Sequence, residues 1–150
     1  MMNTNTAVPN VKTVTATVSA DDFRKLWEKG PLAHLQLIVA DTFYCIQDEA
    51  TWLKDFKATH SSFPVYDYQK RDCDNYAVFM AGAISMQRDV NGVVIIFDTS
   101  GKHSYNAVVV VAADGSMAFK IAEPQLDAFV PADKAGKAPY SEQAGFAVAT

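Results

Sequence analysis

The second half of the chain carries three runs of β-branched and apolar residues separated by short turns. The runs cover residues 93–98, 103–112 and 116–122, and the turns between them contain Gly101 and Gly115. Runs of this length, bounded by turns that contain glycine, predict three strands in an antiparallel meander. Because helical patterns precede these strands instead of alternating with them, we expect an α+β fold.

The first half of the chain carries the helical patterns. A capping-box sequence predicts a helix over residues 19–27. Two further helices are predicted over residues 48–57 and 73–87. Residues 11–18 alternate with a period of two and predict a strand, whereas the stretch 35–46 is ambiguous between strand and the end of a helix.

A chain of 150 residues fits a single domain, so we expect one domain over residues 1–150. Residues 1–10 are expected to form a loose arm. Residues 131–150 are expected to form an irregular tail, in which residues 145–150 add a short edge strand. This organisation leaves the predicted helices and the meander to form the core.

Composition narrows the class of partner and the compartment. The net charge of −4 argues against nucleic acid as a partner, since nucleic-acid binding needs a basic face. Two cysteines are few for a secreted disulfide scaffold. The start of the chain has neither the basic nor the apolar region of a signal peptide, and no apolar run is long enough to span a bilayer. We therefore expect a cytoplasmic protein without a membrane partner.

The segment before the third predicted helix places a cysteine at a helix start. Asp72 is a good N-cap residue, which makes Cys73 the first helical residue. A thiol at that position is favoured as thiolate, and the first-turn N–H groups can hold an oxyanion, although the flanking acids oppose the thiolate. Taken alone, the pattern favours an inert cysteine, because free cysteine is usually a small buried apolar residue. Cys45 fits that inert description more clearly.

A histidine and a glutamate stand at the ends of adjacent predicted strands. If the loop 113–115 has three residues, Tyr105 faces Glu123, and His103 becomes a diagonal neighbour of Glu123 on the buried face. A two-residue turn would instead send His103 and Glu123 to opposite faces. The first register brings together an imidazole and a carboxylate that can orient it.

Two other polar residues compete with Glu123 for contact with His103. A tight turn at residues 100–101 would put Asp98 directly across from His103. Asn106 is a weaker choice, because it points to the opposite face in a regular strand. His34 and His60 have no comparable neighbours in the sequence and are taken as structural or exposed.

These motifs together resemble a known family. Asp-Cys-Asp-Asn-Tyr at residues 72–76, His-Ser-Tyr-Asn at 103–106 and Glu-Pro-Gln at 123–125 are similar to the papain-like protease domain at the C-terminus of the fairy-ring mushroom agglutinin, and to short bacterial and phage proteins of the same pattern. The resemblance covers roughly residues 35–130 and includes Asp-Thr-Phe-Tyr at 41–44, with a tyrosine where the family pattern has phenylalanine at position 76.

The resemblance implies a papain-like fold, in which a nucleophile at the start of a central helix packs on a C-terminal antiparallel sheet. It implies a thiol hydrolase that cleaves peptide or other amide bonds of peptide or protein substrates. The implied catalytic triad consists of Cys73 as nucleophile, His103 as base and Glu123 as orienting group. The sequence requires no cofactor. The family implies calcium dependence, and Asp74 is a candidate calcium ligand, but the resemblance assigns no further ligands residue by residue.

Two other functions stay open at this point. One is a cell-wall amidase of related fold, of the kind that phage encode. The other is a binding or structural module without turnover, which should leave Cys73 no more reactive than Cys45. The agglutinin's sugar-binding repeats have no counterpart in these 150 residues, so the resemblance carries no expectation of a lectin function.

Overall fold

A computed structural model describes residues 16–63 and 72–150 of the chain. The helices in this part are α1 (Ala20–Lys29), α2 (Glu49–His60) and α3 (Cys73–Arg88). The strands are β1 (Ala16–Ser19), β2 (Gln36–Val39), β3 (Phe43–Ile46), β4 (Val94–Asp98), β5 (His103–Val111), β6 (Met117–Glu123), β7 (Ala128–Phe129) and β8 (Gly145–Ala149). The α+β class is confirmed. The predicted arm over residues 1–10 lies outside the described residues.

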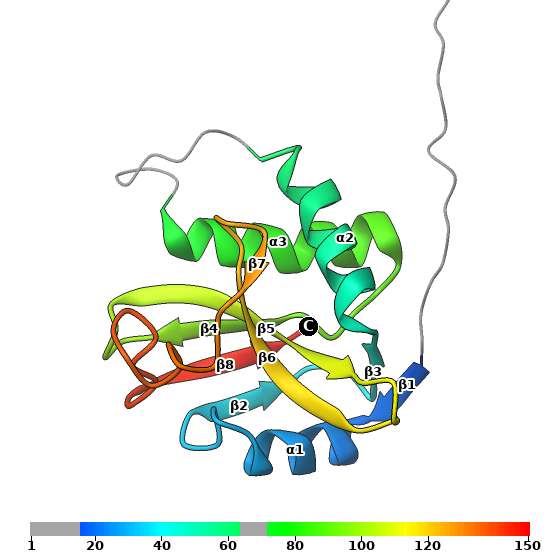
Figure 1. Cartoon of the computed structure of the whole chain (residues 1–150), viewed down its shortest axis with the longest axis horizontal. Coiled ribbons are helices and arrows are strands. Elements are labelled where there is room, and N and C mark those ends of the chain that lie inside the picture. The colour runs from blue at the N-terminus through cyan, green and yellow to red at the C-terminus, as the bar shows by residue number, and fades with distance from the viewer. Residues whose placement is uncertain (1–15, 64–71) are drawn as a thin grey trace, which may run out of the picture.

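A six-stranded sheet in the order β2-β8-β4-β5-β6-β7 separates α1 from α2 and α3 (Figure 1). Alternate residues of β5 enter the two cores. Tyr105, Ala107 and Val109 pack on the side of α1, whereas Val108 and Val110 pack on the side of α2 and α3. The sequence pattern predicts a single buried face for this strand. Both faces are buried because helices cover the sheet on each side.

The C-terminal strand departs from its predicted position. We expected an edge strand over residues 145–150, but β8 lies inside the sheet, parallel to β2 and antiparallel to β4. The sheet is therefore mixed, and it includes a strand from the first half of the chain. The ambiguous stretch 35–46 contains β2 and β3, and β3 pairs with β1 in a separate two-stranded sheet.

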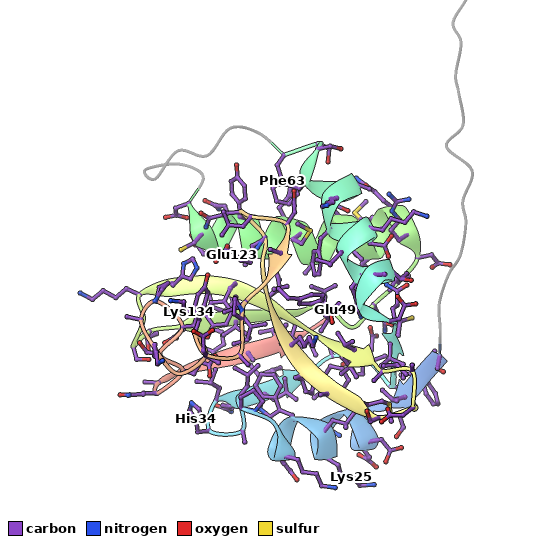
Figure 2. The ribbon with its side chains drawn as sticks, in the orientation of Figure 1. Lys25, His34, Glu49, Phe63, Glu123 and Lys134 are labelled. Atoms are coloured by element: carbon purple, nitrogen blue, oxygen red, sulfur yellow. The ribbon has the colours of Figure 1, made fainter. Side chains whose placement is uncertain are left out.

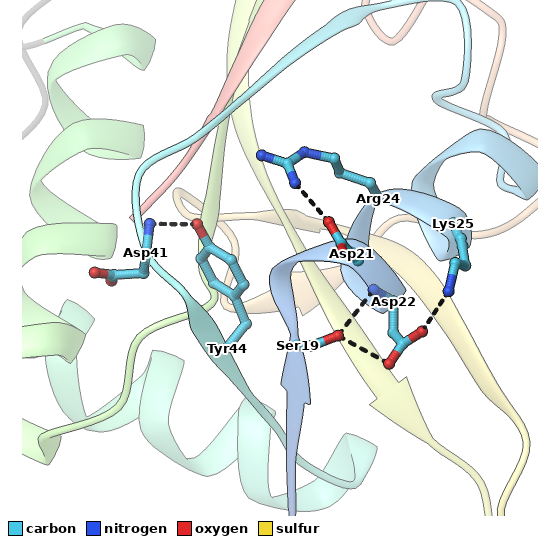
Figure 3. Close-up of polar contacts among 7 residues, drawn as sticks. All are labelled: Ser19, Asp21, Asp22, Arg24, Lys25, Asp41 and Tyr44. Carbon is cyan, nitrogen blue, oxygen red and sulfur yellow. Dashed lines mark hydrogen bonds and ion pairs between the residues drawn. The ribbon is translucent and has the colours of Figure 1, made fainter.

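The start of α1 confirms the predicted cap. Ser19 Oγ accepts a hydrogen bond from the Asp22 N–H at 3.1 Å and donates to Asp22 Oδ2 at 2.9 Å (Figure 3). Asp22 also contacts Lys25, and Asp21 contacts Arg24, one turn along the helix. These ion pairs are exposed and contribute little, so the cap and the buried ring of Phe23 fix where α1 begins.

The Asp-Thr-Phe-Tyr segment at residues 41–44 has a structural role. Tyr44 stacks on Phe23 with ring centroids 4.3 Å apart, and its hydroxyl accepts a hydrogen bond from the Asp41 N–H at 2.7 Å (Figure 3). Asn91 then joins this segment to the strand that follows α3. Its amide donates to Asp41 Oδ2 and to the Phe43 carbonyl, at 2.9 and 2.7 Å.

Within the part of the chain that the structure describes, no helix is long and apolar enough to cross a membrane.

Candidate functional site

The hairpin between β5 and β6 has the register that the three-residue loop predicted. The Ala112 N–H donates to the Ser116 carbonyl at 2.8 Å, and Gly115 adopts a positive φ of 82°. Because this register continues along both strands, His103 Nε2 and Glu123 Oε2 lie 2.7 Å apart. The predicted contact between His103 and Glu123 is confirmed; its role is a separate question.

Tyr140 completes this cluster, and no pattern in the sequence predicted its place there. Its hydroxyl donates to Glu123 Oε2 at 2.9 Å, and its ring centroid lies 5.5 Å from that of His103. The Gln125 N–H donates to the other oxygen, Glu123 Oε1, at 3.2 Å. Glu123 is therefore buried but well supplied with donors. Burial, followed by the Glu123 charge, raises the pKa of Tyr140, which keeps its hydroxyl protonated.

Asp98 lies opposite His103 in the β4–β5 register, as the tight-turn alternative predicted. Its carboxylate nevertheless serves the neighbouring loops. It accepts hydrogen bonds from Ser100 Oγ at 2.5 Å, the Gly101 N–H at 2.8 Å and the Glu142 N–H at 2.7 Å. Burial raises the pKa of Asp98, but these hydrogen bonds outweigh burial and leave it below its ordinary value. Asp98 therefore holds loops together, and Glu123 is the carboxylate that contacts His103.

Cys73 is the first residue of α3 and is partly exposed. In residues 16–63 and 72–150, no hydrogen bond or ion pair joins Cys73 to His103. The two nevertheless belong to one end of the molecule, where α3 and β5 both begin (Figure 1). Asn106 aligns these elements, because its amide donates to the Ala77 carbonyl of α3 at 3.0 Å and to the Val94 carbonyl of β4 at 3.2 Å. Asn106 thus points away from His103, as expected.

The other two histidines lie elsewhere. His34 is exposed beside α1 (Figure 2). His60 was expected to have no partner, but its Nδ1 lies 2.7 Å from Asp127 Oδ2. This pair ties the end of α2 to the turn that follows Glu123, a contact across 67 positions that no local pattern could reveal.

A pocket of about 490 Å³ adjoins the cluster. One wall comes from β7 and the turn before it, and the other from the segment 131–140; Figure 2 shows Glu123 and Lys134 on this side of the molecule. The lining residues are Glu123, Leu126, Ala128, Phe129, Val130, Pro131, Lys134, Ala138, Pro139 and Tyr140. Its volume suits a small organic ligand.

Asp74, the predicted calcium ligand, belongs to no group of potential metal ligands in the described residues. Among the described residues, no three His, Cys, Asp or Glu side chains gather closely enough to hold an ion. A hydrogen bond between Asp72 and Asp74 raises the pKa of Asp74, and burial adds to the rise. Calcium binding stays a prediction.

Comparison with known proteins finds solved structures of similar fold but assigns this chain to no family. No family model matches the chain, and no curated protein matches it. Among solved structures, the chain is similar to a PSL1a–E64 complex, with a TM-score of 0.63 and 16% identity over 88% of this chain and 51% of that one. It is also similar to Polyporus squamosus lectin bound to the human-type influenza-binding epitope Neu5Aca2-6Galb1-4GlcNAc, with a TM-score of 0.61 and 16% identity over 88% of this chain and 49% of that one. The fold is shared with a lectin. The chain spans about half the length of these two chains.

This finding corrects the functional part of the sequence analysis. One of these two structures is named as a lectin, and neither is named as a protease. The assignment to a papain-like protease family and the description as a thiol hydrolase acting on peptide substrates are therefore wrong. There is also a physical reason for this error. A short motif can predict which side chains lie close together, but it does not determine whether they catalyse a reaction.

Proposed function

We propose that this chain is a carbohydrate-binding module whose ligand occupies the pocket beside Glu123 and Tyr140. The observation that carries the proposal is the Glu123 carboxylate, which is only 5% exposed, lines the pocket and accepts hydrogen bonds from three groups. A carboxylate has about four acceptor sites, so roughly one is left for a ligand hydroxyl. Its neighbours fix its direction, which lowers the ordering cost of binding.

The site residues of the sequence analysis take binding roles in this proposal. With Nε2 directed at Glu123, neutral His103 keeps Nδ1 as an acceptor, while protonated His103 offers it as a donor. His103 and Glu123 are proposed as polar contacts of the ligand. Cys73, the first residue of α3, is proposed as a residue of the rim.

The remaining walls suit a sugar. Phe129 and Tyr140 give aromatic surface for the C–H face of a sugar ring, and the Lys134 ammonium can pair with the carboxylate of an acidic sugar. The lectin with the same fold is bound to a sialylated epitope. That epitope, Neu5Aca2-6Galb1-4GlcNAc, is therefore the first ligand to test.

Titration calorimetry with this trisaccharide, backed by a glycan array, tests the proposal. We expect saturable binding that weakens at least about tenfold in Glu123→Gln and in Lys134→Ala, since a hydrogen bond to a charged group contributes about 1.5–3 kcal/mol. Glu28→Gln is the matched control, because Glu28 is an exposed carboxylate on α1. Folded protein that binds no glycan on the array would refute the proposal.

Thiol reactivity separates a binding module from a thiol enzyme. Alkylation by iodoacetamide at pH 7, followed by peptide mapping, compares Cys73 with Cys45, both of which are partly exposed. A module without turnover should label the two thiols at similar rates. Labelling of Cys73 more than about tenfold faster than Cys45 would indicate an activated thiolate and would contradict a role in binding alone.

A further inference from the structure

Glu142 is a buried carboxyl group that the proposed binding site does not use. It is 2% exposed, and its Oε1 has no hydrogen-bond partner among the described residues. The Gly136 N–H lies near its carboxyl group, and its own N–H donates to Asp98 Oδ2 at 2.7 Å. Glu142 therefore joins the segment 131–142 to the end of β4.

The groups around Glu142 offer little compensation for a negative charge. Asp98 faces it from β4, and Tyr105 of β5 and Tyr140 of its own segment lie in the same cluster. In the described residues, no lysine, arginine or histidine forms an ion pair with it. Asp98 has its own donors and stays ionised, so a charged Glu142 would be a second anion beside the first.

Protonation relieves this conflict. Burial, followed by the charge of Asp98, raises the pKa of Glu142 to about 7. An acid whose pKa is raised in the closed structure makes its full contribution to the stability of that structure at pH values below the ordinary pKa of glutamate. That contribution is lost as the pH rises through about 7.

We propose that Glu142 is a proton-operated latch: its neutral carboxyl group holds the segment 131–142, and with it one wall of the pocket beside Glu123, in the closed conformation. The segment supplies Lys134, Pro139 and Tyr140 to that wall. Loosening it removes the Tyr140 hydrogen bond to Glu123 and opens the pocket. This inference rests on the proposed function only for its consequence on ligand affinity.

Hydrogen exchange tests the latch without any ligand. Between pH 5 and pH 8, after correction for intrinsic exchange chemistry, we expect the opening constant of the amides at 140–144 to rise about 10- to 100-fold, because the open carboxyl ionises near its ordinary pKa. Glu142→Gln keeps the shape without a titrating group, so its opening constant should stay flat over this range. Glu28→Gln, the exposed control, should behave like the unmodified protein.

Affinity for Neu5Aca2-6Galb1-4GlcNAc, measured at the same pH values, tests the consequence. The unmodified protein should bind more weakly at pH 8 than at pH 5, and Glu142→Gln should lose this difference. Opening constants of the unmodified protein that are equal at pH 5 and pH 8 would overturn the latch, even if Glu142→Gln fails to fold. A pH-dependent opening without glycan binding at any pH would support the latch and refute the proposed carbohydrate function.

Discussion

Replacing Asn106 by aspartate should destabilise the protein, and the loss should grow with pH. Asn106 is fully buried, its amide donates to the Ala77 and Val94 carbonyls, and its Oδ1 has no partner in the described residues. Aspartate has the same shape, but it presents oxygen to both carbonyls. Only its protonated form can keep one of the two hydrogen bonds.

The magnitude follows from these contacts. Loss of one hydrogen bond that leaves a buried carbonyl without its donor costs about 1–3 kcal/mol at any pH. Keeping the acid neutral costs a further 1.4 kcal/mol or so for each pH unit above about 3.9. The folded pKa of the new acid is raised, so the protein is most stable below the unfolded pKa and loses stability as the pH rises. Between pH 4.5 and pH 7, Asn106→Asp should lose about 3 kcal/mol more than the unmodified protein.

Urea unfolding followed by tryptophan fluorescence measures these differences, since Trp27 and Trp52 are both buried. Subtracting the unmodified protein at each pH removes the titration of Glu142. Asn106→Ala is the control: it loses both hydrogen bonds but adds no acid, so its deficit of about 2–4 kcal/mol should be the same at both pH values. If Asn106→Asp stays within about 1 kcal/mol of the unmodified protein at pH 7, the alignment of α3 on β4 and β5 does not depend on this amide.

Three further predictions concern glycines and calcium. Gly82→Ala should raise the free energy of unfolding by about 0.5–1 kcal/mol, because the added carbon meets nothing within 4 Å apart from its chain neighbours and the backbone of its own helix, α3. Gly101→Ala should lower it by about 1–3 kcal/mol, because the added carbon would lie 1.9 Å from the Pro139 carbonyl oxygen; urea unfolding that ranks the two variants in the opposite order would contradict both. Millimolar calcium should raise the melting temperature relative to chelator, and superimposed melting curves would remove calcium from consideration.

Local signals account for the part of the fold that the sequence predicted. Ser19 and Asp48 cap the helices that follow them through contacts only three residues away. Gly115 fixes a loop length, and loop length fixes the register that brings His103 to Glu123. Each of these features needs only neighbouring residues, so a pattern in the sequence suffices.

Contacts between distant segments account for the features that were missed. Tyr140 stands in a stretch of lysine, glycine and proline that has no periodicity, and only the folded chain brings it to Glu123. Asp98 and Glu123 look equivalent in the sequence as partners of His103. The structure distinguishes them, because the Asp98 carboxylate accepts hydrogen bonds from Ser100 Oγ and from the Glu142 N–H of neighbouring loops. The motif around Cys73 likewise identifies residue types at a helix start, but it does not determine their function.

The position of β8 between β2 and β4 has a consequence for the order of folding. Gln36 of β2 pairs with Phe146 of β8, 110 positions along the chain, and β8 also pairs with β4, whereas β4 with β5 and β5 with β6 are pairs of consecutive strands. Non-local pairing raises the relative contact order and slows folding. The meander and α3 can therefore assemble early, while β2 can join the sheet only after β8 has paired with β4. Until then, β4 presents an unpaired edge, which makes this intermediate the stage at which two chains are most prone to associate.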